Sequence, residues 1–198
     1  GISMDEKTMS CADVAKRLRI LFYLAFVGLV PPLMCLAPQL LVAADWAALA
    51  VSVANAAVLL SLAAAGKRYR SAGLLAVIAA VCSLLAMFVA TSVLSSAAGI
   101  CGLIGMYNEY EGHADQVREQ DPKQAKRWSN LFIWQICLGF LMGILAVTVA
   151  FMSVGMNMAE RTVLLISLLV PMFISLGLQI VYIIYLNRTC RLLESGKV

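Results

Sequence analysis

The sequence carries little charge. Only 13% of its 198 residues are Asp, Glu, Lys or Arg, and 62% are hydrophobic, whereas a soluble domain is about 25% charged. The mean hydropathy is +0.90. So few charged side chains cannot cover a water-exposed surface, which excludes an ordinary soluble protein. We predict an all-α, polytopic transmembrane helical bundle that forms a single integral membrane domain over residues 1–198.

Catalytic and metal-binding signatures are also missing. The chain has one histidine, His113, and none of its six cysteines forms a C-x-x-C pair. It contains no G-x-S-x-G nucleophile motif, no phosphate-binding glycine loop, no H-E-x-x-H and no dinucleotide fingerprint. The sequence therefore predicts no cofactor and no metal.

The middles of the apolar runs contain no ionisable residue. Proton-coupled carriers and intramembrane hydrolases generally place such a residue within the bilayer. The deep polar groups are instead the amides of Asn55, Gln135 and Gln179. Each amide either bridges two helices or contacts a solute, so we take these three as candidate ligand-binding residues.

Five uncharged runs organise the chain. They cover residues 20–44, 46–66, 71–108, 128–159 and 162–187. Four of them suit one crossing each, since a crossing needs about 20 apolar helical residues. The run 71–108 would make a helix about 57 Å long, against a hydrocarbon core of about 30 Å. It therefore either overhangs the membrane or folds back as a hairpin near residues 91–96.

The basic residues discriminate between these alternatives. Six crossings with cytoplasmic N- and C-termini place all but one, Arg161, of the 15 Lys and Arg residues inside, whereas five crossings divide them almost evenly. The positive-inside rule favours six crossings, with five as the alternative. Segments 38–45, 89–92 and 155–161 are then outside, in a multi-pass protein of the cytoplasmic membrane. No basic block with interleaved aromatics indicates nucleic acid.

Several local signals mark breaks and ends. Gly1–Ser3 precede Met4 and are interpreted as an expression scar. Pro31-Pro32 predict a kink or break in the first crossing, and Pro171 predicts a kink in the last. Asp121-Pro122 predicts a helix N-terminus. Residues 107–127 are interpreted as a cytoplasmic helical connection, a short hairpin that projects from the membrane.

Small residues recur at helical spacing in two places. They are Gly99, Gly102 and Gly105 in one apolar run, and Gly139 and Gly143 in another. Such stripes let helices approach closely in lipid, so helix packing is the predicted role. A lipid-free groove lined by these residues is the alternative. The Gly139-x-x-x-Gly143 motif is also compatible with a homodimer.

Glu109 and His113 are four residues apart and share one face of a helix at the cytoplasmic membrane surface. They form an interfacial polar cluster that could handle a metal or a phosphate. Zinc sites, however, recruit three or more converging ligands. A solvated, salt-bridged helix end is therefore the preferred interpretation.

These features favour a small-solute binding or transport module. In outline, six short crossings with both ends inside resemble the substrate-binding subunits of energy-coupling-factor vitamin importers. An accessory or assembly subunit is the alternative, with the projecting hairpin as its partner surface. A membrane-embedded enzyme at the inner leaflet, using Glu109 and His113, is a third. The predicted partners are the lipid bilayer and a second copy or another membrane subunit.

Overall fold

The computed structural model describes residues 9–89, 91–152 and 154–196, and all regular elements in these ranges are helices. Residues 1–3, interpreted as a scar, and Ala90 of the predicted outer turn lie outside them. The helices are α1 (Cys11–Val27), α2 (Val30–Met34), η1 (Pro38–Leu40), α3 (Leu41–Ser61), η2 (Ala63–Ala65), α4 (Lys67–Phe88), α5 (Ser92–Val117), α6 (Pro122–Met152) and α7 (Met158–Glu194).

Within the described ranges, five helical segments are long and apolar enough to cross a membrane. They are Cys11–Met34, Pro38–Ser61, Lys67–Phe88, Pro122–Met152 and Met158–Glu194. The remaining long helix, α5, has 26 residues, but its second half carries Glu109, Glu111 and Asp115. The all-helical fold and the several membrane-compatible helices agree with the sequence prediction.

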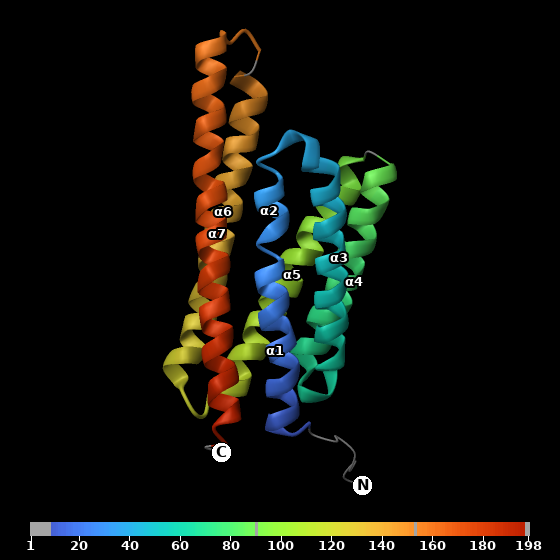
Figure 1. The fold of residues 1–198 in the computed structure, drawn as a ribbon, viewed down its shortest axis with the longest axis vertical. Coiled ribbons are helices and arrows are strands. Elements are labelled where there is room, and N and C mark those ends of the chain that lie inside the picture. The colour runs from blue at the N-terminus through green and yellow to red at the C-terminus, as the bar shows by residue number, and fades with distance from the viewer. Residues whose placement is uncertain (1–8, 90, 153, 197–198) are drawn as a thin grey trace.

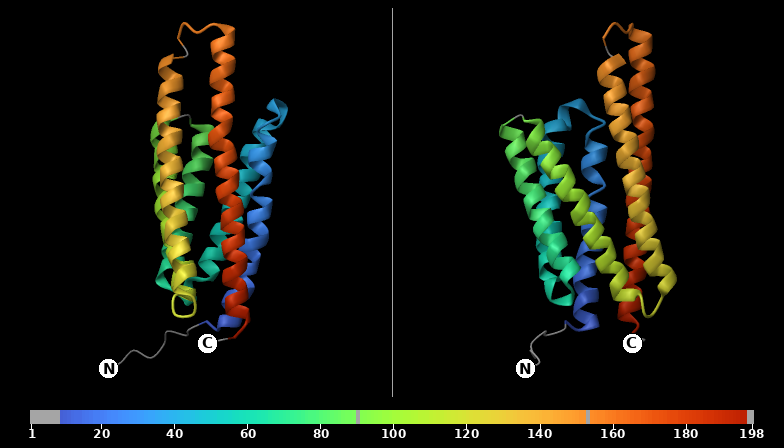
Figure 2. Two further views of the ribbon diagram at one scale, coloured as in Figure 1. Left: turned by 90° about the vertical axis from the view of Figure 1, so that its left-hand side faces the viewer. Right: turned by 180° about the vertical axis from the view of Figure 1, so that it is seen from behind.

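The long helices form a closed ring (Figures 1 and 2). Going round it, α1 contacts α3, α3 contacts α4, α4 contacts α5, α5 contacts α6, α6 contacts α7, and α7 returns to α1. Helix α5 also contacts α7 across the ring. The start of α1, the start of α4, the α5–α6 turn and the end of α7 lie at one end of the bundle, here called the basic end.

The prolines act differently in the two segments for which a kink or break was predicted. The first segment is broken between α1 and α2, just before Pro31-Pro32, because these residues cannot donate backbone hydrogen bonds to the preceding turn. Helix α7 continues through Pro171 as one element. The Gln124 backbone N–H donates to Asp121 Oδ1 at 3.0 Å, which confirms the predicted N-terminus of α6.

The long run 71–108 folds back on itself. Helix α4 ends at Phe88 and α5 begins at Ser92. The Leu94 N–H donates to the Thr91 hydroxyl oxygen at 3.4 Å, so Thr91 caps α5. The predicted break near residues 91–96 therefore lies at the first residue of that range, and the serines after it are helical.

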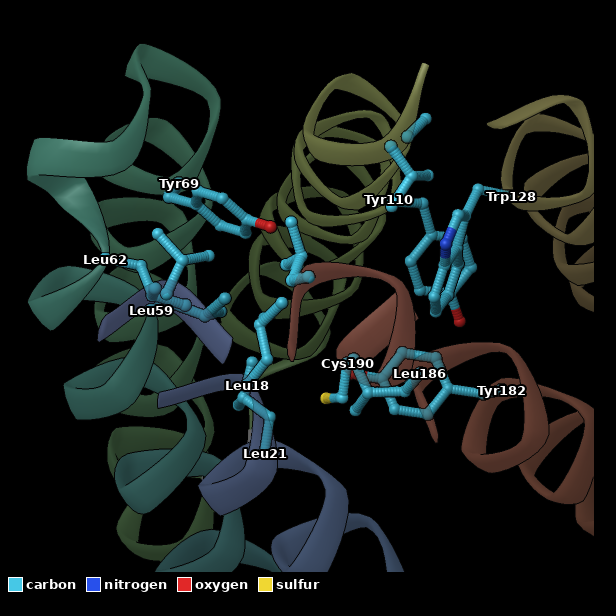
Figure 3. Close-up of a cluster of buried hydrophobic side chains, with 14 of the residues drawn as sticks. Leu18, Leu21, Leu59, Leu62, Tyr69, Tyr110, Trp128, Tyr182, Leu186 and Cys190 are labelled. Atoms are coloured by element: carbon cyan, nitrogen blue, oxygen red, sulfur yellow. The ribbon is translucent and has the colours of Figure 1, made fainter. Parts of the chain in front are cut away.

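The hydrophobic core lies near the basic end, which corrects one prediction. Residues 107–127 do not project as a free hairpin, because Tyr110, Ala114, Val117 and Ala125 are buried. The physical reason is aromatic packing around Trp128. Its ring lies 5.4 Å from Tyr110 and 5.5 Å from Tyr182, between centroids, and Figure 3 shows Tyr110 and Trp128 side by side.

The structure also corrects the prediction that the glycine stripes pack helices closely. A Cβ on Gly105 would contact α4, with Leu75 Cβ at 3.4 Å, so close packing holds there. A Cβ on any of four other glycines would meet nothing within 4 Å among the described residues: Gly99, Gly102, Gly139 and Gly143. Within one chain these four therefore do not bring helices together. The homodimer stays a prediction.

Candidate functional site

A cavity of about 300 Å³ lies between α3, α4, α5 and α7, and we call it the inner cavity. Alanines and leucines make up much of its wall, since α3 and α4 are rich in small apolar residues. Its polar lining groups are Ser52, Asn55, Ser83, Glu109, Gln179 and Tyr182. An apolar wall with a few polar groups is typical of a small-molecule site.

A second cavity of about 410 Å³, the outer cavity, adjoins the inner one. Ser52, Asn55 and Gln179 line both and form their shared wall. The outer cavity lies beside the break between α1 and α2 and reaches the exposed residues Cys35 and Asp45. Polar groups therefore run from the exposed Asp45 to Glu109 inside the bundle.

The break in the first segment also orients Gln179. The Gln179 Nε2 group donates to the Ala25 carbonyl oxygen at 3.3 Å. Gly28 follows directly on the end of α1, and a Cβ there would lie 3.7 Å from Gln179 Nε2. The Pro-induced break thus holds one wall of both cavities in place.

Glu109 forms the acidic inner end of the inner cavity. Its Oε1 accepts a hydrogen bond of 2.5 Å from the Tyr182 hydroxyl. The Glu109 side chain keeps 18% of its exposure. The carboxylate is therefore held by α7 and accessible from the cavity.

His113 lies behind Glu109 and is fully buried. Its Nδ1 lies 2.9 Å from the Tyr69 hydroxyl, and its Nε2 lies 3.4 Å from Glu109 Oε1. Within the described ranges Nε2 makes no hydrogen bond. The prediction of a solvated helix end is therefore wrong for His113, because Tyr69 of α4 and Trp128 of α6 cover the imidazole.

Gly112 lets Tyr69 reach His113. A Cβ at this position would lie 3.1 Å from Tyr69 Cε1, tighter than ordinary van der Waals contact. Tyr69 itself is fully buried, and Figure 3 shows it projecting from α4 into the core. The missing side chain at Gly112 makes room for the ring.

Two further acidic residues of α5, Glu111 and Asp115, pair with Arg118. Arg118 Nη2 lies 2.9 Å from Asp115 Oδ1 and 3.3 Å from Glu111 Oε2. The Ser129 hydroxyl donates to Glu111 Oε1 at 2.7 Å. Helix α5 thus has one face with Glu111 and Asp115, which pair with Arg118, and another face with Glu109 and His113.

The structure brings together some of the sequence-predicted residues and separates others. Asn55, Gln179, Glu109, Gly102 and Gly105 line the inner cavity. Gln135 lies instead near the phenol of Tyr110, outside the inner cavity. The remaining glycines, Gly99, Gly139 and Gly143, line an apolar groove between α5 and α6.

Sequence reasoning missed the two tyrosines of the site. Tyr69 lies between two of the uncharged runs, and Tyr182 lies within the run 162–187. A tyrosine hydroxyl inside a helical bundle needs a hydrogen-bond partner. That requirement was the available signal that both residues contact polar groups.

The arrangement can bind a polar solute and can hold a proton between a carboxylate and an imidazole. Among the described residues, no group of three or more His, Cys, Asp or Glu could hold a metal ion. No protein family model, no curated protein and no solved structure matches this chain.

Proposed function

We propose that this protein binds a small polar solute inside its helical bundle and moves it across the membrane. The observation that carries the proposal is the pair of adjoining cavities with the shared wall Ser52, Asn55 and Gln179. Known small-molecule sites have volumes of about 300–1,000 Å³. The inner cavity, at about 300 Å³, suits a solute of only a few non-hydrogen atoms.

The proposal includes six crossings with both termini in the cytoplasm. The fold-back between α4 and α5 supports it, as does the position of the basic clusters at one end of the bundle. Helix α5 is the least apolar of the proposed crossings because its second half carries Glu109, Glu111 and Asp115. Glu109 and His113 lie on its inward face. Ionisable residues in membrane helices usually face the bundle interior, where they mark functional sites.

The two ends of the bundle suggest how the solute gains access to the cavities from one side of the membrane and then from the other. The outer cavity reaches the exposed residues Cys35 and Asp45. At the basic end, the aromatic core around Trp128 closes the bundle, and Arg19 joins α1 to Glu194 of α7 at 2.7 Å. This conformation is then open away from the cytoplasm, and release inside requires the aromatic core to part.

The same geometry gives less support to the two alternative functions, an accessory subunit and a membrane-embedded enzyme. The accessory-subunit hypothesis used a projecting hairpin as partner surface, but residues 110–125 of that segment have a buried face. The enzyme hypothesis used Glu109 and His113 at the inner leaflet. His113 is instead buried, and Glu109 faces the inner cavity.

Solute binding is tested by thermal melting of the full chain in detergent. The panel contains glycerol, acetate and ethanolammonium chloride as neutral, anionic and cationic solutes. We expect at least one to raise the melting temperature, because binding only the folded state stabilises it. Asn55→Leu should abolish that rise, since it removes a polar group shared by both cavities.

Asn108→Leu is the matched control. The Asn108 amide donates to the Ile104 carbonyl oxygen of its own helix at 2.9 Å, so its loss should leave solute stabilisation intact. The solute that binds is then tested for uptake into liposomes containing the protein. A rise in melting temperature that survives Asn55→Leu, or binding without uptake, would contradict transport through these cavities.

A further inference from the structure

The inner cavity has one carboxylate in its wall, Glu109. Resting on the solute-binding function above, we propose that the solute is a small primary ammonium ion. It pairs with Glu109 and displaces the proton that His113 otherwise carries. The site would then exchange one cation for one proton.

The negative charge of Glu109 needs a positive partner inside the bundle. A carboxylate inside a helical bundle is costly unless a positive charge lies beside it. Within the described ranges, the ion pair of Glu109 is with His113, at 3.4 Å. In the empty site, protonated His113 therefore balances the charge of Glu109.

The Nε2 atom of His113 lies next to the same carboxylate. It is fully enclosed, makes no hydrogen bond among the described residues, and faces the carboxylate that lines the inner cavity. A cation in the cavity would draw on the same carboxylate. If the cation and the proton on His113 were present together, one positive charge in the bundle would be unbalanced. Binding of the cation therefore favours loss of the proton from His113.

Tyr69 can satisfy either state of the imidazole. When His113 is protonated, its Nδ1–H donates to the Tyr69 oxygen across the 2.9 Å contact. When His113 is neutral with the hydrogen on Nε2, the Tyr69 O–H donates to Nδ1 instead. A hydroxyl group allows this reversal, so a change of charge leaves no group at Nδ1 unpaired.

The groups that face His113 come from three other helices. Helix α4 contributes Tyr69, α6 contributes Trp128 and α7 contributes Tyr182. Cys190 of α7 and Asp115 of α5 also act electrostatically on Tyr69. Among the facing groups, Glu109 is the carboxyl group that pairs with the imidazole, at 3.4 Å.

The rest of the wall suits an organic ammonium ion better than an inorganic cation. Asn55, Gln179 and Ser52 offer oxygen acceptors for ammonium hydrogens, and Tyr110 and Tyr182 offer aromatic surface. Alanine and leucine side chains leave room for a carbon chain. A hard metal cation needs about six converging oxygens at short range, whereas this wall has one carboxylate and much of it is alanine and leucine.

The test uses ethanolammonium chloride as probe and ethylene glycol as its matched neutral solute. Calorimetric titration of the full chain in two buffers with different heats of ionisation reports the protons released. We expect close to one proton per ethanolammonium bound under mildly acidic conditions. Its affinity should weaken by up to about tenfold per unit of falling pH, since each cation displaces one proton.

Single-residue variants separate the role of Glu109 in cation binding from the role of His113 in proton release. Glu109→Gln should abolish cation binding, and the matched control Glu111→Gln should not, because Glu111 pairs with Arg118 and does not line the inner cavity. His113→Gln should bind the cation without proton release and with no dependence on pH. Tyr69→Phe should reduce proton release, because protonated His113 then lacks a partner for Nδ1. The two-buffer measurement on the unaltered chain decides the proposal even if a variant fails to fold.

Three results would overturn the proposal. Equal binding of ethylene glycol, still dependent on Asn55, would leave the solute-binding function standing and refute a cationic solute. Potassium chloride releasing the same proton would assign the site to an inorganic cation. Ethanolammonium binding without proton release would refute the exchange. If no solute in either experiment binds, the proposed function fails together with this inference.

Discussion

At the scale of single residues, Gly112 controls how closely Tyr69 approaches His113. A methyl group at Gly112 would lie 3.1 Å from the Tyr69 ring, which is fully buried and hydrogen bonded. We expect Gly112→Ala to lower the melting temperature, because overpacking costs about 1–3 kcal/mol and exceeds the helix-propensity gain of about 1 kcal/mol.

Gly99→Ala is the comparison for that change. A methyl group at Gly99 meets nothing within 4 Å, so only the propensity gain remains and the melting temperature should rise or stay constant. Thermal melting of both variants in one detergent checks the prediction. Equal shifts for the two alanines would show that Tyr69 moves freely and does not hold the imidazole.

The burial of His113 could not be predicted from the sequence. Helical spacing placed it on the same face as Glu109, and the structure has the two within 3.4 Å. Its burial comes from Tyr69, 44 residues earlier, and from Trp128 on another helix. Pairing of that kind depends on how the helices are arranged in the ring, which local periodicity does not encode.

At the scale of helices, the α5–α6 turn is tied to α7 by charge. Arg188 Nη2 lies 2.9 Å from Asp121 Oδ2. The Gln124 backbone N–H, with the Arg188 guanidinium, holds the pKa of Asp121 below its usual range. A lowered pKa means a contribution to stability that is present above the unfolded value, about 3.9, and is lost as pH falls through the folded value.

Asp121→Asn tests this link. At neutral pH it should lower the melting temperature by the equivalent of about 1 kcal/mol or less, as for a partly exposed ion pair. The difference from the parent should shrink below about pH 4, where Asp121 itself becomes neutral. Glu119→Gln, on the exposed surface of the same turn, is the control. A difference that stays constant with pH would refute an electrostatic contribution.

Helix boundaries were more predictable than helix contacts. The charged residues that interrupt the apolar runs predicted the turn before α4, the run length with the polar residues 91–96 predicted the turn after it, and Asp121-Pro122 predicted the start of α6. The contact face was not predictable from small residues alone. The tightest approach is at Gly73, where a Cβ would lie 2.9 Å from the Leu60 backbone nitrogen of α3, whereas Gly139 and Gly143 face an open groove.

At the scale of the whole molecule, the two ends of the ring differ in composition. The basic end carries ion pairs that link α1 to α7 and α7 to the α5–α6 turn. The opposite end holds the mouth of the outer cavity beside Asp45. In the proposed orientation, which follows the positive-inside rule, the basic end is cytoplasmic. The same assignment puts the cavity mouth outside, so orientation and the direction of access depend on each other.

This orientation can be tested by labelling single cysteines with a membrane-impermeant maleimide in intact cells. On a background without the six native cysteines, Ser92→Cys should react from outside, because residue 92 is exposed at the start of α5. Gln120→Cys, in the α5–α6 turn, should react only after permeabilisation. If Ser92→Cys labels only after permeabilisation, or not at all, α4 and α5 do not form two crossings. Five crossings would then apply, the termini would lie on opposite sides, and the outer cavity could not be assigned to the outside by the basic residues.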